Sequence, residues 1–236
     1  MWSAFGNVND INCWEEEDGS GLQRVGEVTF GSGDAYGWIL SKDQWTDATE
    51  KSIVGETREY RFYATPEKGR LVDEQVTFTA DQGDVKFGDT KEGGIIAVRM
   101  RPEVCEDNAF ITNALGDKGE ENCWGKPSPW CDYSGKLADV GWRGLAIFDN
   151  PGNLRYPTSW HVRKYGLMAA NCFGYSFFSK EAHNKGLVPE NGDYLLPAGK
   201  TQIFNYRVYV HSGDVEKAKV GERYADYTKP PQASWK

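Results

Sequence analysis

The sequence lacks the features of two large classes of protein. It has no cluster of Lys or Arg, and its 27 basic and 35 acidic residues give a formal net charge of −8. A chain with this charge has no general attraction to phosphate backbones, so we expect no nucleic-acid partner. The longest apolar runs, residues 94–98 and 144–148, are far shorter than the roughly 20 residues that cross a bilayer. We expect no membrane partner, and because residues 1–6 lack the pattern of a signal peptide, the cytoplasm is the default compartment.

The motifs of common cofactor sites are also missing. The sequence has no P-loop, no Gly-x-Gly-x-x-Gly after a strand and no Gly-x-Ser-x-Gly elbow, so it lacks the signatures of ATP, NAD and serine-hydrolase chemistry. The histidines form no close pair at metal-ligand spacing, and we expect no metal and no other cofactor; they are His161, His183 and His211. The five cysteines are expected to be mostly reduced, with a disulfide between Cys123 and Cys131 as the alternative.

Large aromatic rings and glycines are abundant instead. Nine Trp, twelve Tyr and eleven Phe suit pleated strands, and 27 Gly suit many tight turns. Every second residue is apolar in segments 76–80 and 204–210, as in half-buried strands, whereas only residues 214–227 have helical periodicity. The sequence therefore predicts an all-β protein, an antiparallel β-sandwich with one short C-terminal helix; the large supersandwich is one form that such a sandwich can take. Since no linker interrupts the chain, residues 1–236 are expected to form a single domain.

Candidate catalytic residues come from two segments. A histidine near its usual pKa exchanges protons at neutral pH, and Arg163, two residues after His161 along a strand, would point to the same face. Glu92 stands beside two glycines at the head of an apolar strand and is the candidate acid or base partner of His161. The plainer alternatives are that His161 is a hydrogen-bonded structural residue and Arg163 a surface charge, and that Glu92 belongs to a charged hairpin tip.

Candidate binding residues surround these two. Residues 122–133 hold two tryptophans beside a lysine and an aspartate, a combination typical of sugar sites, where a ring packs on C–H groups and charges bond hydroxyls. The alternative is a loop fixed by two buried tryptophans. We expect Trp130 to stack on a sugar ring, and we expect the orienting groups for hydroxyls or a carboxylate to be Arg99, Lys126, Arg163 and Asn171.

Several stretches of the chain are similar to a bacterial family called PmoA-like, whose members carry the label methane oxygenase. They span nearly the whole chain in order, at residues 2–9, 90–94, 124–126, 130–135, 149–153 and 157–167. The resemblance implies a soluble β-rich protein whose relatives accompany sugar-oxidising dehydrogenases. It also implies a His-rich N-terminal portion before the position of Trp2, so that this chain would be truncated relative to the family. Loss of the first strands would leave a bare sheet edge through which a homo-oligomer can form.

Three functions remain open on these grounds. The leading hypothesis is a carbohydrate-active enzyme of the epimerase, mutarotase or lyase type, in which His161 and Glu92 transfer protons on a small-molecule sugar or glycan. The second is a non-catalytic carbohydrate-binding or assembly module. The third, a metal-dependent oxygenase, follows only from the family label and requires at least two of the histidines to converge. A perturbed His or Glu in a concave pocket favours the enzyme, and an open aromatic-lined face favours the binding module.

Overall fold

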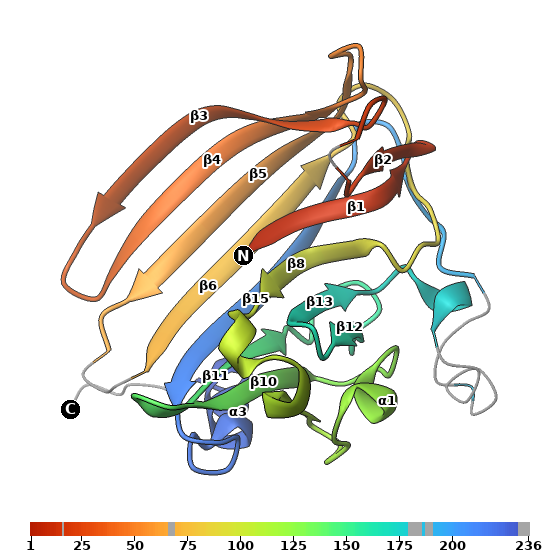
Figure 1. Cartoon of the computed structure of the whole chain (residues 1–236). Coiled ribbons are helices and arrows are strands. Elements are labelled where there is room, and N and C mark those ends of the chain that lie inside the picture. The colour runs from red at the N-terminus through yellow and green to blue at the C-terminus, as the bar shows by residue number, and fades with distance from the viewer. Residues whose placement is uncertain (16, 66–68, 179–185, 187–190, 231–236) are drawn as a thin grey trace.

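Two antiparallel β-sheets pack face to face in the computed structural model of the chain (Figure 1). The structure describes all residues except 16, 66–68, 179–185, 187–190 and 231–236. The predicted all-β sandwich with a short C-terminal helix is confirmed.

The two sheets differ in size. The larger has eight strands in the order β3 (Leu22–Ser32), β4 (Tyr36–Thr46), β5 (Ser52–Tyr63), β6 (Arg70–Thr79), β15 (Thr201–Ser212), β11 (Gly141–Asp149), β10 (Trp130–Leu137) and β9 (Phe110–Asn113). The smaller has the order β12 (Ser159–Arg163), β13 (Leu167–Asn171), β8 (Gly93–Arg99), β1 (Trp2–Val8), β7 (Val85–Phe87) and β14 (Tyr194–Leu196), with β2 (Ile11–Cys13) paired to β1. The helices are α1 (Glu120–Cys123) and α3 (Val220–Thr228), and 3-10 turns lie at Pro102–Val104, Glu106–Asn108 and Tyr175–Phe177.

Strand alternation produces the core between the sheets. In β6, Val76 and Phe78 are fully buried and face the smaller sheet, so we call this side of the larger sheet its inner face. The ring of Phe78 lies 5.5 Å from that of Trp45 and 5.2 Å from that of Phe87, measured between centroids. Burial of such rings, worth about 25 cal/mol per Å² of apolar surface, is the main force that holds the sheets together.

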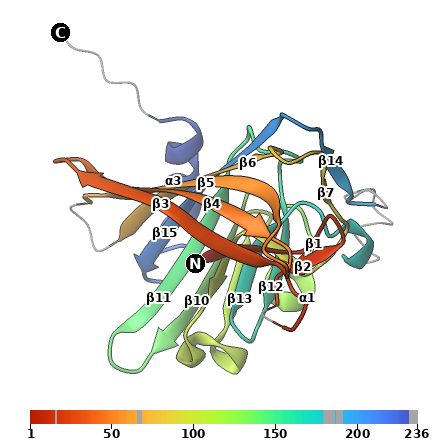
Figure 2. The same cartoon turned by 90° about the horizontal axis from the view of Figure 1, so that it is seen from above.

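The larger sheet extends beyond the smaller one. Both views show the far ends of β3, β4 and β5 projecting past the strands of the smaller sheet (Figures 1 and 2). We call this part the wing and define it as residues 25–32, 36–43, 56–63 and 70–74. The outermost strand, β3, pairs only with β4 among the described strands, and all of its residues except Gly31 are exposed. A free edge suitable for a homo-oligomer thus exists, and the oligomer itself stays a prediction.

The C-terminal helix begins later than the sequence predicts. Residues 215–219 form turns, in which Asp214 Oδ1 accepts a hydrogen bond from the backbone N–H of Lys217 at 2.9 Å, and Lys219 has a φ of 55°. A left-handed residue interrupts α-helical geometry, so α3 starts only at Val220. It packs Tyr224 against Phe148 on the outer face of the larger sheet. Among the described residues, no helix is long and apolar enough to cross a membrane.

The cysteines are all free thiols, including Cys123 and Cys131. Burial raises the pKa of Cys123 to about 12, and it raises that of Cys131 well above its usual value. The alternative of a disulfide between these two residues is not realised in the structure.

Candidate functional site

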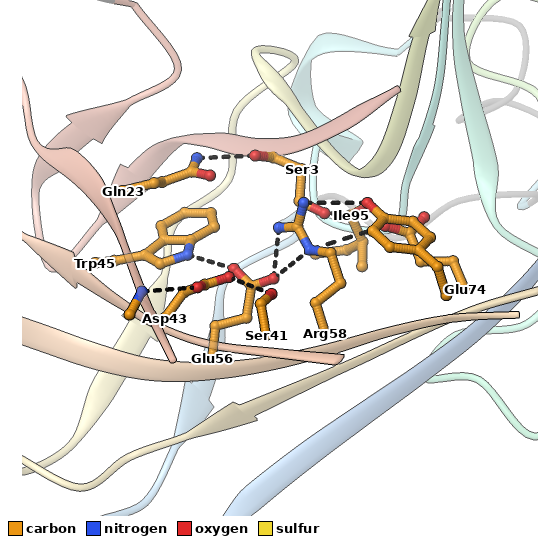
Figure 3. A network of polar contacts seen from close by, with 11 residues as sticks. Ser3, Gln23, Ser41, Asp43, Trp45, Glu56, Arg58, Glu74 and Ile95 are labelled. Atoms are coloured by element: carbon orange, nitrogen blue, oxygen red, sulfur yellow. Dashed lines mark hydrogen bonds and ion pairs between the residues drawn. The ribbon is translucent and has the colours of Figure 1, made fainter. Parts of the chain in front are cut away.

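A cluster of charged side chains lies on the inner face of the wing, near its junction with the core (Figure 3). The register of β4, β5 and β6 places Glu56 opposite Asp43 and Glu74 opposite Tyr60. Arg58 lies between these two rows, on the same face, because alternate residues of a strand share a side. We call this set the acidic cluster; its members are Asp43, Glu56, Arg58, Tyr60 and Glu74.

Hydrogen bonds fix one carboxylate of the acidic cluster. Glu56 accepts from Trp45 Nε1 at 2.5 Å and from Arg58 Nε at 2.6 Å, and it also pairs with Arg58 Nη2. The side chains of Glu56 and Arg58 are 1% and 12% exposed. Arg58 Nη1 in turn donates to the Tyr60 hydroxyl at 3.4 Å. The ionised form of Glu56 is therefore the one that its neighbours stabilise.

The second buried carboxyl group, Glu74, has more distant partners. It is fully buried, Arg58 Nε lies 3.9 Å away, and Tyr60 lies beside it in the register. Burial raises the pKa of Glu74 to about 7, Arg58 and a hydrogen bond from the Tyr60 hydroxyl oppose the shift, and the charge of Glu56 adds to it. Burial also raises the pKa of Glu56. The cluster thus combines a carboxyl group that accepts hydrogen bonds from Trp45 and Arg58 with a second one that can hold a proton near neutral pH.

The acidic cluster is closed on one side and open on the other. On the core side, Gln23 Nε2 donates to the Ser3 carbonyl at 2.8 Å and the Ser3 hydroxyl donates to the Ile95 carbonyl, which ties β3, β1 and β8 together (Figure 3). Toward the tip of the wing, the rings of Tyr60 and Phe62 are neighbours with centroids 6.1 Å apart. Phe62 is 43% exposed. The cluster therefore forms the inner end of an open, partly aromatic face.

The predicted pair of His161 and Glu92 lies elsewhere, on the smaller sheet. His161 alternates with the core residues Trp160 and Val162, and it therefore faces outward, where it is only 2% exposed. Burial lowers the pKa of His161 to about 4, and the charge of the nearby Glu92 opposes this shift. Glu92 itself pairs with Lys91. The structure thus brings the predicted pair into one neighbourhood, but with a neutral imidazole at physiological pH.

Two predicted binding residues share that neighbourhood. Arg163 Nη1 pairs with Glu120 Oε1 at 2.7 Å, and its guanidinium lies 4.9 Å from the centre of the Trp124 ring. Asn171 Nδ2 donates to the Lys91 carbonyl at 3.1 Å. Both side chains are engaged in contacts within the protein.

The other predicted binding residues are distributed over the molecule. Arg99 lies over the ring of Tyr165 at 5.1 Å, and Lys126 Nζ lies 3.5 Å from Asp117 Oδ1. Trp130 packs with α3 on the outer face of the larger sheet, because its neighbour in β10, Cys131, takes the inner face. The structure therefore does not bring Trp130 to His161.

The histidines do not form a metal site in the part of the chain that the structure describes. His161 lies in β12 of the smaller sheet, His211 lies in β15 of the larger one, and His183 is outside the described residues. No group of three His, Cys, Asp or Glu side chains among the described residues is placed to hold a metal ion.

The acidic cluster escaped the sequence analysis. Its signal is weak: in β5, the alternate positions Glu56, Arg58 and Tyr60 continue the face of the apolar Val54. Alternation along the strand can reveal charged residues on a face that begins with apolar ones. In this segment, however, the other face also carries charges, so the two faces look alike in the sequence.

Searches among curated proteins and solved structures find no relative that indicates a function. No curated protein matches the chain. Among solved structures, a polysaccharide lyase matches with 12% sequence identity and a TM-score of 0.31, covering 82% of this chain and 26% of its own. The chain thus spans about a quarter of that lyase, and a likeness at this TM-score supports no argument about function.

The family assignment corrects the sequence analysis. The profile of a family of unknown function, DUF6807, matches residues 1–225, and no PmoA-like profile matches. The resemblance to the PmoA-like family is therefore wrong, and the oxygenase hypothesis, which rested on that label, loses its support. Because the match covers nearly the whole chain, the protein belongs to the family DUF6807.

Proposed function

We propose that the acidic cluster and the open inner face of the wing form a sugar-binding site, at which the cluster transfers protons. The observation that carries the proposal is the pair of buried carboxyl groups, Glu56 and Glu74, beside a single guanidinium, that of Arg58. Such a pair, with unequal surroundings, divides the roles of acid and base between two identical groups.

The chemistry of the wing favours a neutral sugar. Rings such as Tyr60 and Phe62 pack against the C–H face of a sugar, and the carboxylate of Asp43 can accept from its hydroxyls. The cluster holds three carboxyl groups and one cation, so it disfavours acidic sugars by charge repulsion. From Glu56 to Phe62 the strand is about 20 Å long, which leaves room for several sugar units.

Ring opening of an aldose requires only two proton transfers, one to a base and one from an acid. The carboxylate of Glu56 accepts the proton of the anomeric hydroxyl, the bond between the anomeric carbon and the ring oxygen breaks, and the ring oxygen receives a proton. Glu74 supplies that proton through the half-buried hydroxyl of Tyr60, which lies beside it in the register. Ring closure reverses these transfers, and no cofactor takes part. General acid–base catalysis of this kind contributes about 10²–10⁴-fold.

Two-dimensional exchange NMR on neutral aldoses tests the proposal. The protein should accelerate exchange between the α and β anomers, and Glu74→Gln should slow the catalysed exchange about 100-fold while sugar binding is retained. Gln75→Ala, on the adjacent but outward-facing residue, is the matched control and should leave the rate unchanged. If Glu74→Gln exchanges anomers as fast as the wild type, the acid role is wrong.

A non-catalytic sugar-binding module is the second candidate, favoured by one observation. Glu74 is fully buried and Glu56 is 3% exposed, so the contact between the sugar and Glu56 that the reaction requires needs neighbouring side chains to move aside. A binding module predicts sugar binding without anomer exchange, and it predicts that Phe62→Ala weakens binding while Glu74→Gln does not. Exchange that depends on Glu74 would exclude it.

A further inference from the structure

A second pocket lies on the outer face of the larger sheet, over the three strands at the end opposite to the wing. Its volume is about 330 Å³. Phe110, Ser134 and Trp142, from β9, β10 and β11, line its floor, and residues 118–119 and 214–216 line its rim. This volume falls at the lower end of the range of small-molecule sites, and one sugar ring fits within it.

Two aromatic rings form part of the floor of this pocket. The rings of Phe110 and Trp142 meet edge to face, with centroids 4.5 Å apart and planes inclined at 64°. Phe110 is 47% exposed, whereas the next residue of the strand, Ile111, points to the opposite face and is buried. Two adjacent rings that are left accessible on a sheet face offer an apolar surface to a ligand.

A buried pair of titratable side chains lies behind the floor. His211 Nε2 lies 2.6 Å from Asp132 Oδ2, and His211 Nδ1 lies 3.2 Å from the Gly213 carbonyl oxygen. Gly144 makes this pair possible, because a Cβ atom there would lie 2.4 Å from the imidazole Cε1. The His211 ring therefore lies over β11 at Gly144, because glycine is the one residue type without a Cβ atom.

One oxygen of that pair is left without a well-formed hydrogen bond. Asp132 is fully buried, and its Oδ1 has no hydrogen bond of good geometry from a described residue, although the Ser134 hydroxyl is near enough to lower the pKa of the carboxyl group. Thr112 is paired with Asp132 across the strands, and Ser134 follows it on the same face; both line the pocket. A buried acceptor without a donor costs about 1–3 kcal/mol or more. A donor that enters between Thr112 and Ser134 would recover this free energy.

We propose that this pocket binds a single neutral sugar ring, separately from the wing. The ring packs against Trp142, and one hydroxyl donates to Asp132 Oδ1. A hydroxyl is favoured over an ammonium group because His211 Nε2 already contacts the other oxygen of Asp132, and Lys118 at the rim offsets the acidic residues of the loop at 214–216. Only the class of ligand rests on the proposed function; the position of the pocket does not.

NMR titration of the labelled protein with methyl glycosides of neutral monosaccharides tests this inference. Amide shifts should appear at residues 110–112, 134 and 214–216. Trp142→Ala should weaken this binding at least tenfold, and Trp142→Phe should retain most of it. Thr112→Val, which removes a hydroxyl beside Asp132 at nearly constant shape, should also weaken binding, and it replaces Trp142→Ala if that variant does not fold.

The wing provides an independent arm of the experiment. Phe62→Ala should reduce shifts on the wing and leave those at the pocket unchanged. Pocket shifts without wing shifts would support this inference and contradict the proposed function, and the reverse would overturn this inference alone. Pocket shifts that are equal in Trp142→Ala and the wild type, or that only an alkylamine produces, would also overturn it.

Discussion

The acidic cluster of the wing and the neighbourhood of His161 both bury titratable groups, but they treat charge differently. Around His161 each charge has its own partner: Lys91 pairs with Glu92, and Arg163 pairs with Glu120; the atoms left there without a hydrogen-bond partner among the described residues, His161 Nδ1 and Trp124 Nε1, are uncharged. In the acidic cluster, one guanidinium faces several carboxyl groups, and the fully buried Glu74 lies 3.9 Å from Arg58 and beside the Tyr60 hydroxyl. Unbalanced buried charges of this kind are typical of functional sites.

His161 and Glu74 also differ in their protonation at neutral pH. Burial lowers the pKa of His161 to about 4, so its ring is neutral and does not change charge near pH 7. Burial raises the pKa of Glu74 to about 7, which puts its protonation change in the physiological range. Desolvation thus acts in both regions, but it produces a proton donor at neutral pH only in the wing.

Removal of Arg58 should have the largest effect on stability. Arg58→Met leaves two carboxyl groups buried without a cation and should lower the free energy of unfolding by about 3–5 kcal/mol. Arg163→Met is the matched change near His161 and should cost only about 1 kcal/mol, because its ion pair is partly exposed. Urea denaturation at pH 7 measures both. Equal losses would show that the two regions treat charge alike.

Glu74 should make the protein less stable as the pH rises. Its folded pKa is raised from 4.5 to about 7, so the folded state binds this proton more tightly than the unfolded state. The resulting stability is fully present below pH 4.5 and is lost as the pH rises through 7, a change of about 3 kcal/mol. Glu74→Gln should remove this part of the slope in urea denaturation between pH 4.5 and 8. Asp149, whose pKa is also raised to about 7, keeps its own contribution in both proteins.

His161 should show the opposite dependence at lower pH. Because its folded pKa is lowered from 6.5 to about 4, it contributes stability above pH 6.5, and about 3 kcal/mol is lost as the pH falls through 4. Its ring protons should therefore not titrate by NMR between pH 5.5 and 8. A midpoint near 6.5 would mean that the ring is solvated and able to act as the acid or base first predicted.

Phe30 should have the smallest effect on stability. It is 79% exposed at the tip of the wing, so Phe30→Ser should change the free energy of unfolding by less than about 0.5 kcal/mol. Because Phe30→Ser removes a contact with the ligand, sugar binding measured by calorimetry should nevertheless become several-fold weaker. The matched change Leu115→Ser, at a residue that is 66% exposed outside the wing, should leave binding unchanged.

The fold was accessible to sequence analysis because strand alternation is a local signal. The alternating segment 204–210 forms part of β15, and residues 76–79 of the segment 76–80 close β6. The start of the C-terminal helix was not accessible, since the left-handed conformation of Lys219 depends on how the preceding turn packs.

The candidate site was much less accessible. Glu56 and Arg58 are followed by the charged residues Glu59 and Arg61 on the opposite face of β5, and the sequence of that strand therefore suggests a solvent-exposed strand. Glu74 joins them only through the register between β5 and β6, which no local pattern specifies. Trp130 and His161 appeared related because both lie in polar, aromatic segments, but β10 and β12 belong to different sheets.

The most direct test is to map where a neutral oligosaccharide binds, by amide chemical shifts of the labelled protein. We expect the largest shifts in the wing, at residues 41–43 and 56–62, and their loss in Phe62→Ala. Shifts concentrated at residues 91–92 and 161–163, with the wing unchanged, would contradict it and return the site to His161 and Glu92.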